Sequence, residues 1–234
     1  MYKSFSVVAV ADTKISQTIK ALKISCEKIS INKVFLITSK NINKKLLFKE
    51  LTIVKVKPIK SFKEYNHFII YKLYKYITTT HVLLIQWDGF ILNKNKWTDK
   101  YFDYDYIGAP LIPRENNFEY SKDKKGNFYT VGNGGFSLRS LELLEAASKY
   151  KLEDDYEITN YHEDGFYCVL HREFLEKQGF KWAPFKVARN FSIESPLTFE
   201  YIFDIPFGFH GKKMLLIYKI LLLINKKFRL NLIR

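Results

Sequence analysis

Three features of this sequence have residue types and spacing suited to chemistry, and the first is a lone carboxylate. Asp88 lies in the stretch HVLLIQWDGFIL, between Trp87 and Phe90, just after the apolar run His81–Ile85. A carboxylate taken out of water needs a metal ion or a basic group as its partner. Asp88 and Gly89 could instead form a simple turn. Acids in turns usually have polar neighbours, however, so we favour a functional site.

The second feature is the acidic pair Glu163–Asp164, at the head of an apolar helix expected within residues 160–180. Acids in a first turn stabilise a helix through its dipole, which is the structural interpretation. The same position suits a base that removes a proton from a substrate hydroxyl. His210, between Phe209 and Gly211, is either a packed core histidine or a late metal ligand, because imidazole together with carboxylate suits a divalent transition metal.

The third feature is the glycine-rich stretch VGNGGFSLRS, which contains Gly132, Asn133, Gly134 and Gly135. Glycine lets the backbone approach a ligand closely or adopt a positive φ. Helical spacing predicts that a helix follows over Leu138–Lys149, and the N–H groups at its start could bind an anion. The stretch is not a P-loop, because the Lys-Ser/Thr ending is missing. A plain bend between a strand and a helix explains it equally well.

Alternating strands and helices must position these residues. Short connections between them predict an α/β protein with a mostly parallel sheet, and ligands bind such a sheet at the carboxyl ends of its strands. Asp12 and Thr13 follow the first expected strand, and Asp88 follows the fourth. Apolar runs predict strands over 4–10, 33–38, 51–56 and 81–85, and helical spacing predicts helices over 14–29 and 62–77.

Two further segments precede the glycine-rich stretch. Tyr101–Pro113 is expected to be a strand that ends in turn residues. Arg114–Tyr129 is polar and low in aliphatic residues, which predicts a mobile loop. A loop of this length is either a lid over a site or a plain surface insertion.

The length and composition of the chain limit the classes of protein to which it can belong. The chain has 234 residues and is 47% hydrophobic, which suits a single α/β domain with a sizeable core. Its net charge of +14 favours nucleic acid, an anionic membrane or phosphorylated ligands as partners. The total charge alone does not indicate which of these the protein binds. Two cysteines, Cys26 and Cys168, make no disulfide framework or zinc cluster and indicate a reducing compartment. The first apolar run is too short for a signal peptide, so we expect a core strand.

The segment 211–234 has a composition of its own. It contains seven basic residues and no acid, and its apolar run 214–224 is interrupted by Lys219. That run is shorter than the ~20 residues that span a bilayer. We expect a basic amphipathic helix that lies on an anionic membrane surface. The alternative is a helix docked on the domain with a solvated basic end.

Several stretches in a fixed order resemble a known family. HVLLIQWDGFIL, YDYIGAP, VGNGGFSLRS, EDGFYC, FSIE and PFGFH, between about residues 65 and 211, resemble an uncharacterised family of bacterial glycosyltransferase-like domains. Those domains look like nucleotide-sugar transferases of the GT-A fold. The resemblance implies a single GT-A-like domain over residues 1–210, with a mostly parallel central sheet flanked by helices, followed by the tail 211–234.

The resemblance also implies roles for individual residues. GT-A enzymes commonly hold Mn²⁺ or Mg²⁺ on a strand-end Asp-x-Asp motif, and here Gln86 replaces the first acid, so that Asp88 and His210 are the implied metal ligands. Asp164 is the implied base and Glu163 the acceptor-holding residue, although the two could be exchanged. Such a pair implies an inverting transfer. The implied donor-binding residues are Asp12, Thr13, Tyr65, Asn66, Gln86, Trp87, Asp88, Gly132, Asn133, Gly134 and Gly135.

These implications predict a glycosyltransferase of cell-surface polysaccharide or lipooligosaccharide synthesis. It would move a sugar from a nucleotide-sugar donor to a hydroxyl of a glycan or lipid-linked acceptor, in the cytoplasm or on the inner face of the cytoplasmic membrane. A metal-dependent hydrolase of phosphate or glycosidic bonds could use the same acids. A non-enzymatic basic module that binds a membrane or nucleic acid is the third alternative. No nucleic-acid motif is present, so we expect no nucleic-acid partner.

Overall fold

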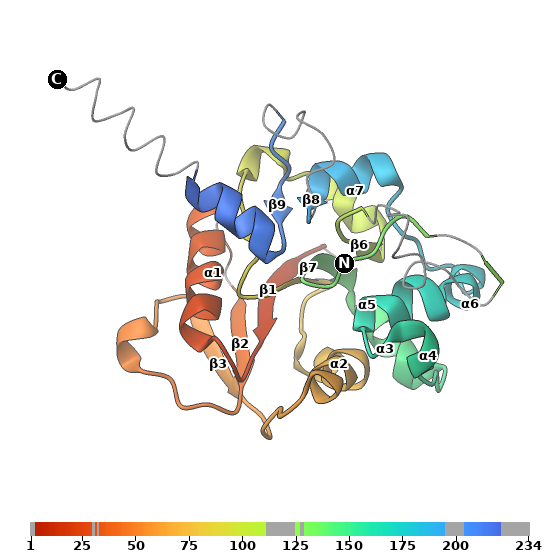
Figure 1. The fold of residues 1–234 in the computed structure, drawn as a ribbon, viewed down its shortest axis with the longest axis horizontal. Coiled ribbons are helices and arrows are strands. Elements are labelled where there is room, and N and C mark those ends of the chain that lie inside the picture. The colour runs from red at the N-terminus through yellow and green to blue at the C-terminus, as the bar shows by residue number, and fades with distance from the viewer. Residues whose placement is uncertain are drawn as a thin grey trace.

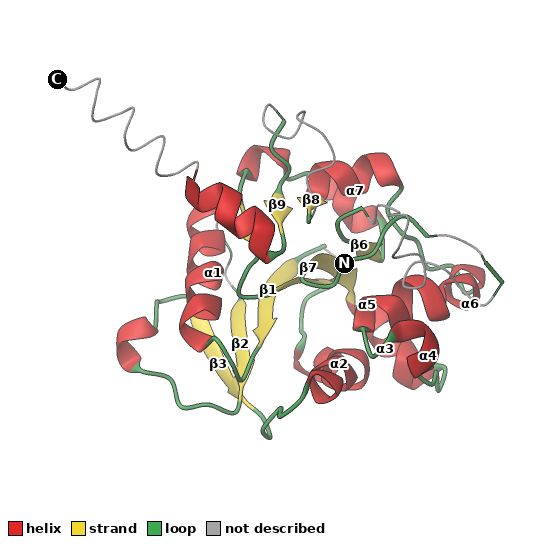
Figure 2. Cartoon of the chain, viewed as in Figure 1, coloured by secondary structure: helices red, strands yellow, loops and turns green. Residues whose placement is uncertain are grey.

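A mixed six-stranded sheet forms the centre of the protein (Figures 1 and 2). The computed structural model describes residues 3–29, 31, 33–110, 125–126, 129–194 and 204–220. Within these residues the strand order is β3-β2-β1-β4-β7-β6, and a second sheet has the order β5-β9-β8. The predicted class, an α/β domain with a mostly parallel central sheet flanked by helices, is confirmed.

Four strands make the parallel part of the sheet. They are β1 (Phe5–Val10), β2 (Val34–Thr38), β3 (Leu51–Lys55) and β4 (His81–Ile85), and each agrees with a predicted strand to within one residue at either end. β1 and β4 are nearly or wholly buried along their length. Both faces of these central strands are covered, which explains why their sequences are continuous apolar runs.

The two remaining strands of the sheet are antiparallel and correct the sequence prediction. The helix expected over Leu138–Lys149 begins only at Leu141, because Phe136–Ser140 forms β7 between β4 and β6. The Ser140 hydroxyl accepts a hydrogen bond from the N–H of Leu143 and caps helix α3 (Leu141–Lys149). The strand expected over Tyr101–Pro113 is reduced to β6 (Tyr106–Ile107), which follows a 3₁₀-helix at Asp99–Asp103.

Helices cover the two faces of the sheet. Helix α1 (Ile15–Lys28) packs Ile19 and Leu22 against one face. Helix α2 (Phe62–Tyr71) and α3 cover the other. The single helix expected over 62–77 is shorter than predicted, because α2 ends at Tyr71 and a separate 3₁₀-helix follows at Leu73–Tyr76. The helix expected after Asn160 is divided into α5 (Glu163–Gly165), a π-helix (Phe166–Leu170) and α6 (Arg172–Lys177).

The small second sheet brings residues 208–209, late in the chain, next to the segment that follows β4. It consists of β5 (Phe90–Ile91), β9 (Gly208–Phe209) and β8 (Ser192–Ile193), the last of which follows helix α7 (Phe185–Phe191). Phe90 pairs with Phe209, so the residues that flank the two strands are also neighbours. A short helix, α4 (Tyr156–Thr159), precedes α5. Further 3₁₀-helices lie at Lys44–Leu46 and Lys94–Lys96.

The C-terminal helix is described over residues 212–220. Met214, Leu215 and Tyr218 pack against the main core, as the docked alternative predicts. Leu216, Ile217 and Ile220 are exposed on the same helix. No helix among the described residues is long and apolar enough to cross a membrane. Most of the predicted loop 114–129 and the tail beyond residue 220 lie outside the described residues, and the domain boundary at residue 210 stays a prediction.

Candidate active site

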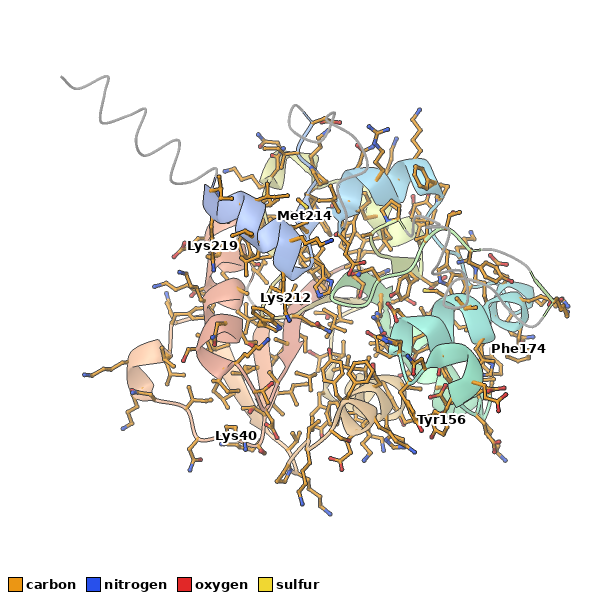
Figure 3. All side chains as sticks on the ribbon, viewed as in Figure 1. Lys40, Tyr156, Phe174, Lys212, Met214 and Lys219 are labelled. Atoms are coloured by element: carbon orange, nitrogen blue, oxygen red, sulfur yellow. The ribbon has the colours of Figure 1, made fainter. Side chains whose placement is uncertain are left out.

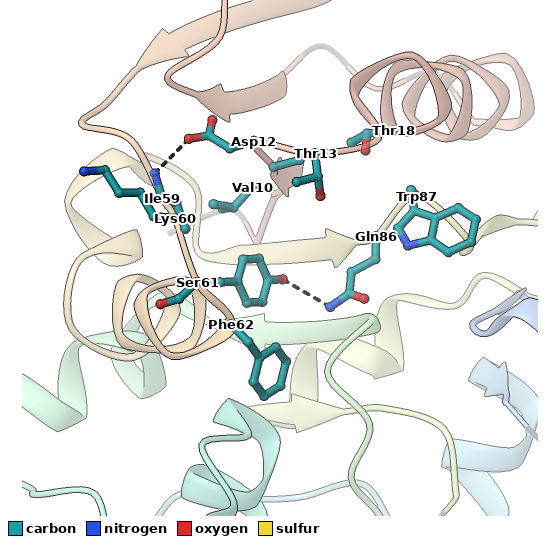
Figure 4. Close-up of a pocket in the computed structure, with 12 residues that line it drawn as sticks. Val10, Asp12, Thr13, Thr18, Ile59, Lys60, Ser61, Phe62, Gln86 and Trp87 are labelled. Atoms are coloured by element: carbon teal, nitrogen blue, oxygen red, sulfur yellow. Dashed lines mark hydrogen bonds between the residues drawn. The ribbon is translucent and has the colours of Figure 1, made fainter.

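A cavity of about 350 Å³ opens at the carboxyl ends of β1 and β4 (Figure 4). This is the edge where a parallel α/β sheet binds ligands. Five residues predicted to bind a donor line the cavity, namely Asp12, Thr13, Tyr65, Gln86 and Trp87. The Gln86 side-chain amide donates a hydrogen bond to the Tyr65 hydroxyl at 3.2 Å, which holds the two side chains together in the wall.

Asp12 forms hydrogen bonds with the loops that border this cavity. Its carboxylate accepts hydrogen bonds from the backbone N–H groups of Ser39 and Ile59, both at 2.7 Å, and from the hydroxyls of Thr38 and Ser39. Burial alone would raise the pKa of Asp12, but these hydrogen bonds, with that from Ile59 foremost, outweigh it and lower the pKa. Asp12 therefore shapes the cavity through hydrogen bonds that engage both of its carboxylate oxygens.

Asp88 and His210 meet because β5 pairs with β9. The chain turns at Trp87–Asp88, where the Gly89 N–H donates to the Gln86 carbonyl at 3.1 Å, so the turn interpretation is correct for the backbone. The Asp88 side chain is nevertheless buried. His210 Nε2 lies 3.4 Å from Asp88 Oδ1 and 3.2 Å from Gln86 Oε1. No hydrogen bond among the described residues reaches Asp88 Oδ1.

Glu194 completes this cluster from the opposite side of the imidazole ring. Its Oε1 lies 3.1 Å from His210 Nδ1. Burial alone would lower the pKa of His210, but its contacts with Asp88 and Glu194 outweigh burial and raise the pKa to about 9. Glu194 ends the FSIE stretch, directly after β8. Sequence reasoning assigned it no role, although an acid at a strand end next to a recognised motif was a usable signal.

The residues around Asp88 fit a divalent cation in part. A buried carboxylate oxygen without a hydrogen bond and an amide oxygen lie together, and such oxygen donors suit Mn²⁺ or Mg²⁺. His210 Nε2 lies beside them, but because the pKa of this imidazole is raised to about 9, the ring must release its proton before it can bind a cation. In the part of the chain that the structure describes, no group of three His, Cys, Asp or Glu residues is placed to hold a metal. The described residues would therefore supply only part of the coordination shell of such a cation.

The glycine-rich stretch passes between these groups and the acidic pair. A Cβ on Gly135 would collide with the His210 ring, and a Cβ on Gly134 would collide with the Glu163 carboxylate. Both glycines are therefore required for close approach. The positive φ expected of a glycine is found at Asn133 instead, at 69°, where the side-chain amide lies 3.2 Å from His210 Nδ1. Gly132 is buried in the same segment.

Glu163 faces inward and pairs with Arg139 of β7. Arg139 Nη2 lies 2.6 Å from Glu163 Oε2, and the arginine side chain is fully buried. Arg139 also donates hydrogen bonds from Nε to the Ser137 hydroxyl and from Nη2 to the Tyr106 hydroxyl. Sequence reasoning missed Arg139, because the residue was expected in the first turn of a helix rather than in a buried strand. In this arrangement Glu163 positions the segment that carries Asp164. The expected contact of Glu163 with an acceptor stays a prediction.

Asp164 is buried beside the same glycines. The Gly134 N–H donates to Asp164 Oδ2 at 2.9 Å, and the Gly165 N–H donates to Oδ1 at 3.0 Å. Burial, followed by the charge of Glu194, raises the pKa of Asp164 to about 6. A carboxylate with a pKa near the working pH is suited to general base catalysis.

The structure therefore brings most of the predicted residues together. Asp88, His210, Gly134, Gly135 and Asp164 form one connected cluster, next to the cavity lined by Gln86. The exception is Asn66, which is buried away from the cavity wall. Its side chain accepts a hydrogen bond from the N–H of Glu163 and thereby ties α2 to α5.

Fold and site together define an α/β domain with a ligand cavity and a cluster of buried acids at the carboxyl edge of its sheet. Residues 49–210 match the family described as Protein of unknown function (DUF5672), and the chain belongs to this family. Comparison with curated proteins finds no match. Among solved structures, the crystal structure of an active-site mutant of LgtC is similar, with 16% identity, a TM-score of 0.49 and coverage of 88% of this chain and 87% of that chain.

Proposed function

We propose that this protein is a glycosyltransferase of the GT-A type, which moves a sugar from a nucleoside-diphosphate donor to a hydroxyl of a glycan or lipid-linked glycan. The observation that carries the proposal is the convergence of Asp88, His210 and Asp164 on Gly134–Gly135, beside a cavity at the carboxyl edge of the sheet. This placement supports the motif resemblance, because groups for the leaving diphosphate and a base for the attacking hydroxyl then lie along one glycine-rich segment next to the cavity.

The cavity at the carboxyl edge suits the nucleotide part of the donor. Its wall contains the aromatic side chains of Phe62, Tyr65 and Trp87, against which a base or ribose can pack. Lys60 also lines it, and the Lys14 ammonium lies 3.5 Å above the Trp87 ring. These two cations favour an anionic ligand. In this proposal the diphosphate extends from the cavity toward Asp88.

Asp88 and His210 would hold a divalent cation, with Gln86 beside them. Such a cation, when bound, neutralises the charge that develops on the diphosphate leaving group. Asp164 accepts the proton of the acceptor hydroxyl as that oxygen attacks the anomeric carbon. Glu163 and Arg139 hold the segment that carries Asp164 in place. Direct attack by the hydroxyl, with Asp164 as the only base, would invert the anomeric configuration.

Thermal unfolding tests donor binding. At a concentration near 100 times its dissociation constant, Mn²⁺ with a nucleoside diphosphate should stabilise the protein by about 2.7 kcal/mol. This corresponds to a rise of roughly 5–10 °C in Tm for a chain of this size. Asp88→Asn should remove most of this increment, whereas the exposed control Asp103→Asn should keep it. If no nucleotide shifted the Tm of the unaltered protein, the proposal would lose its donor site.

Product analysis separates transfer from hydrolysis. A panel of nucleotide sugars is incubated with the protein, with and without Mn²⁺ and with neutral oligosaccharides as acceptors. A transferase releases nucleoside diphosphate with an elongated acceptor, whereas a hydrolase releases free sugar at a rate that acceptors do not increase. The second outcome would favour the hydrolase alternative.

We also propose that the C-terminal helix attaches the protein to an anionic membrane surface, where lipid-linked acceptors lie. The helix over 212–220 exposes Leu216, Ile217 and Ile220, and it carries Lys212 and Lys219 (Figure 3). Apolar side chains next to lysines suit the headgroup layer of anionic lipid. The seven basic residues of segment 211–234 add to this attraction.

Vesicle co-sedimentation tests the membrane proposal. The protein should bind vesicles of phosphatidylcholine with 30% phosphatidylglycerol, and less so as salt rises, because screening weakens the attraction. Replacing Leu216 and Ile220 by serine should weaken binding at least about tenfold, since each exposed leucine or isoleucine contributes ~1.5–3 kcal/mol when it is buried. Phe174→Ser, at an exposed site of α6 on the opposite side of the view in Figure 3, is the matched control. Equal binding of all three proteins would contradict the proposal.

A further inference from the structure

Four rings lie together beside the acidic pair, and we call them the aromatic ledge. Phe62 begins α2, Tyr156 begins α4, and Tyr161 and His162 lie between α4 and α5. The Tyr156 and Tyr161 rings are stacked, with centroids 4.1 Å apart, and the Phe62 ring meets His162 edge to face at 4.8 Å. Phe62 is 53% exposed and Tyr156 is 43% exposed, so both present large apolar surfaces to solvent.

The ledge connects the cavity with the proposed base. Phe62 lines the cavity at the carboxyl edge of the sheet. Its contact His162 directly precedes Glu163 and Asp164. A molecule that rests on Phe62 and His162 would therefore lie beside both the donor cavity and the segment that carries Asp164. This is the place where a transferase must hold its acceptor.

The rings of the ledge are held in position. The Lys63 ammonium lies 4.4 Å from the Tyr156 ring and 5.0 Å from the Tyr161 ring. Asn160 is the left-handed C-cap of α4, with a φ of 46°, which is a common position for asparagine. Tyr161 follows with a φ of 63°, a conformation that is unfavourable for tyrosine and that its surroundings must compensate.

The acidic residues near the aromatic ledge indicate which class of ligand it can bind. Four acids, Glu153, Asp154, Asp155 and Glu157, surround the start of α4, close to Tyr156. They repel a polyphosphate chain, so a nucleic acid strand stacked on these rings is disfavoured. A pyranose ring is neutral, and its C–H face packs well against aromatic faces. Its hydroxyls can donate hydrogen bonds to the neighbouring carboxylates.

We propose that Phe62, Tyr156, Tyr161 and His162 form the acceptor subsite, on which a pyranose ring of a neutral glycan stacks with its reactive hydroxyl toward Asp164. This inference rests on the proposed transferase function and makes it more specific, since it names the acceptor as a neutral carbohydrate. Phe62 belongs to both the ledge and the cavity wall, whereas Tyr156, Tyr161 and His162 are not among the residues that line the cavity.

Saturation-transfer NMR on the full chain tests the ledge without any need for turnover. The probes are maltohexaose, cellohexaose and chitohexaose, with a hexamer of thymidine nucleotides as the polyanionic comparison. At least one oligosaccharide should bind, and Tyr156→Ser and Phe62→Ser should each weaken its binding about tenfold, which is the range expected for the loss of a single ring contact. Tyr156→Phe and the exposed control Phe174→Ser should retain it. The Tm of each variant confirms that it is folded.

Kinetics give a second readout. In a transfer assay, Tyr156→Ser should raise KM for the acceptor about tenfold and leave KM for the nucleotide sugar unchanged. Sugar binding on the ledge without any nucleotide-sugar turnover would overturn the transferase proposal and keep the ledge. Turnover with an unchanged acceptor KM in Tyr156→Ser would overturn the ledge and keep the transferase. Binding of none of the oligosaccharides, or preferential binding of the thymidine hexamer, would also overturn the ledge.

Discussion

Replacement of Asp164 by asparagine should lower the rate of sugar transfer by roughly 10²–10⁴-fold, which is the usual contribution of a general base. Asparagine has the size of aspartate but cannot accept the proton of the acceptor hydroxyl. Its side-chain oxygen can still accept one of the two hydrogen bonds that Asp164 receives from Gly134 and Gly165. The fold and the binding of nucleoside diphosphate should therefore change little. The measurement is kcat with donor and acceptor saturating, beside Asp103→Asn as an exposed control.

The pH dependence of the rate provides a second test of Asp164. The pKa of this carboxyl is raised to about 6, chiefly by burial. A base acts only when it is deprotonated, so the rate should be level above pH 7 and should fall about tenfold per pH unit below pH 6. In Asp164→Asn this acidic limb should disappear. If the variant retained both the full rate and the acidic limb, another group would have to be the base.

Replacement of Arg139 by leucine should destabilise the folded protein by about 3–5 kcal/mol, because it leaves a buried carboxylate without its partner. Glu163 Oε2 lies 2.6 Å from Arg139 Nη2, and the two side chains are 4% and 0% exposed. The substitution also removes the hydrogen bonds from Arg139 to the Ser137 and Tyr106 hydroxyls. A loss of this size should lower Tm by roughly 6–20 °C. Urea unfolding gives the free-energy change directly.

A double variant distinguishes the ion pair from simple loss of volume. Arg139→Leu with Glu163→Leu removes both charges, and it should recover most of the stability lost in the single variant, since apolar replacements of a buried pair are often neutral. Gly134 lies against the Glu163 carboxylate, so the double variant should nevertheless lose transfer activity through disorder of the glycine-rich segment. A cost below about 1 kcal/mol for Arg139→Leu alone would contradict this account of the pair.

The parallel half of the sheet could be predicted because its signals are local. Each of the four strands is a short apolar run bounded by polar residues, and strands covered on both faces require such runs. The same strands place their carboxyl ends at one edge, so Asp12 and Asp88 could be placed at that edge from their positions in the sequence alone. The last three residues of β7 were assigned to a helix because the spacing from Leu138 onward is helical. Their strand conformation buries Arg139, whose charge is paired with Glu163, which lies far away in the sequence.

The order and composition of its strands and motifs were thus sufficient to determine the fold class and to indicate the family, and they predicted which edge of the sheet would carry a site. The partners of individual side chains were decided by tertiary structure. His210 lies between Asp88 and Glu194 because β9 pairs with both β5 and β8. The raised pKa of Asp164 and the ion pair of Glu163 both depend on burial beneath the glycine-rich segment. Burial and long-range pairing exist only once the chain has folded, so no local pattern of residues could report them.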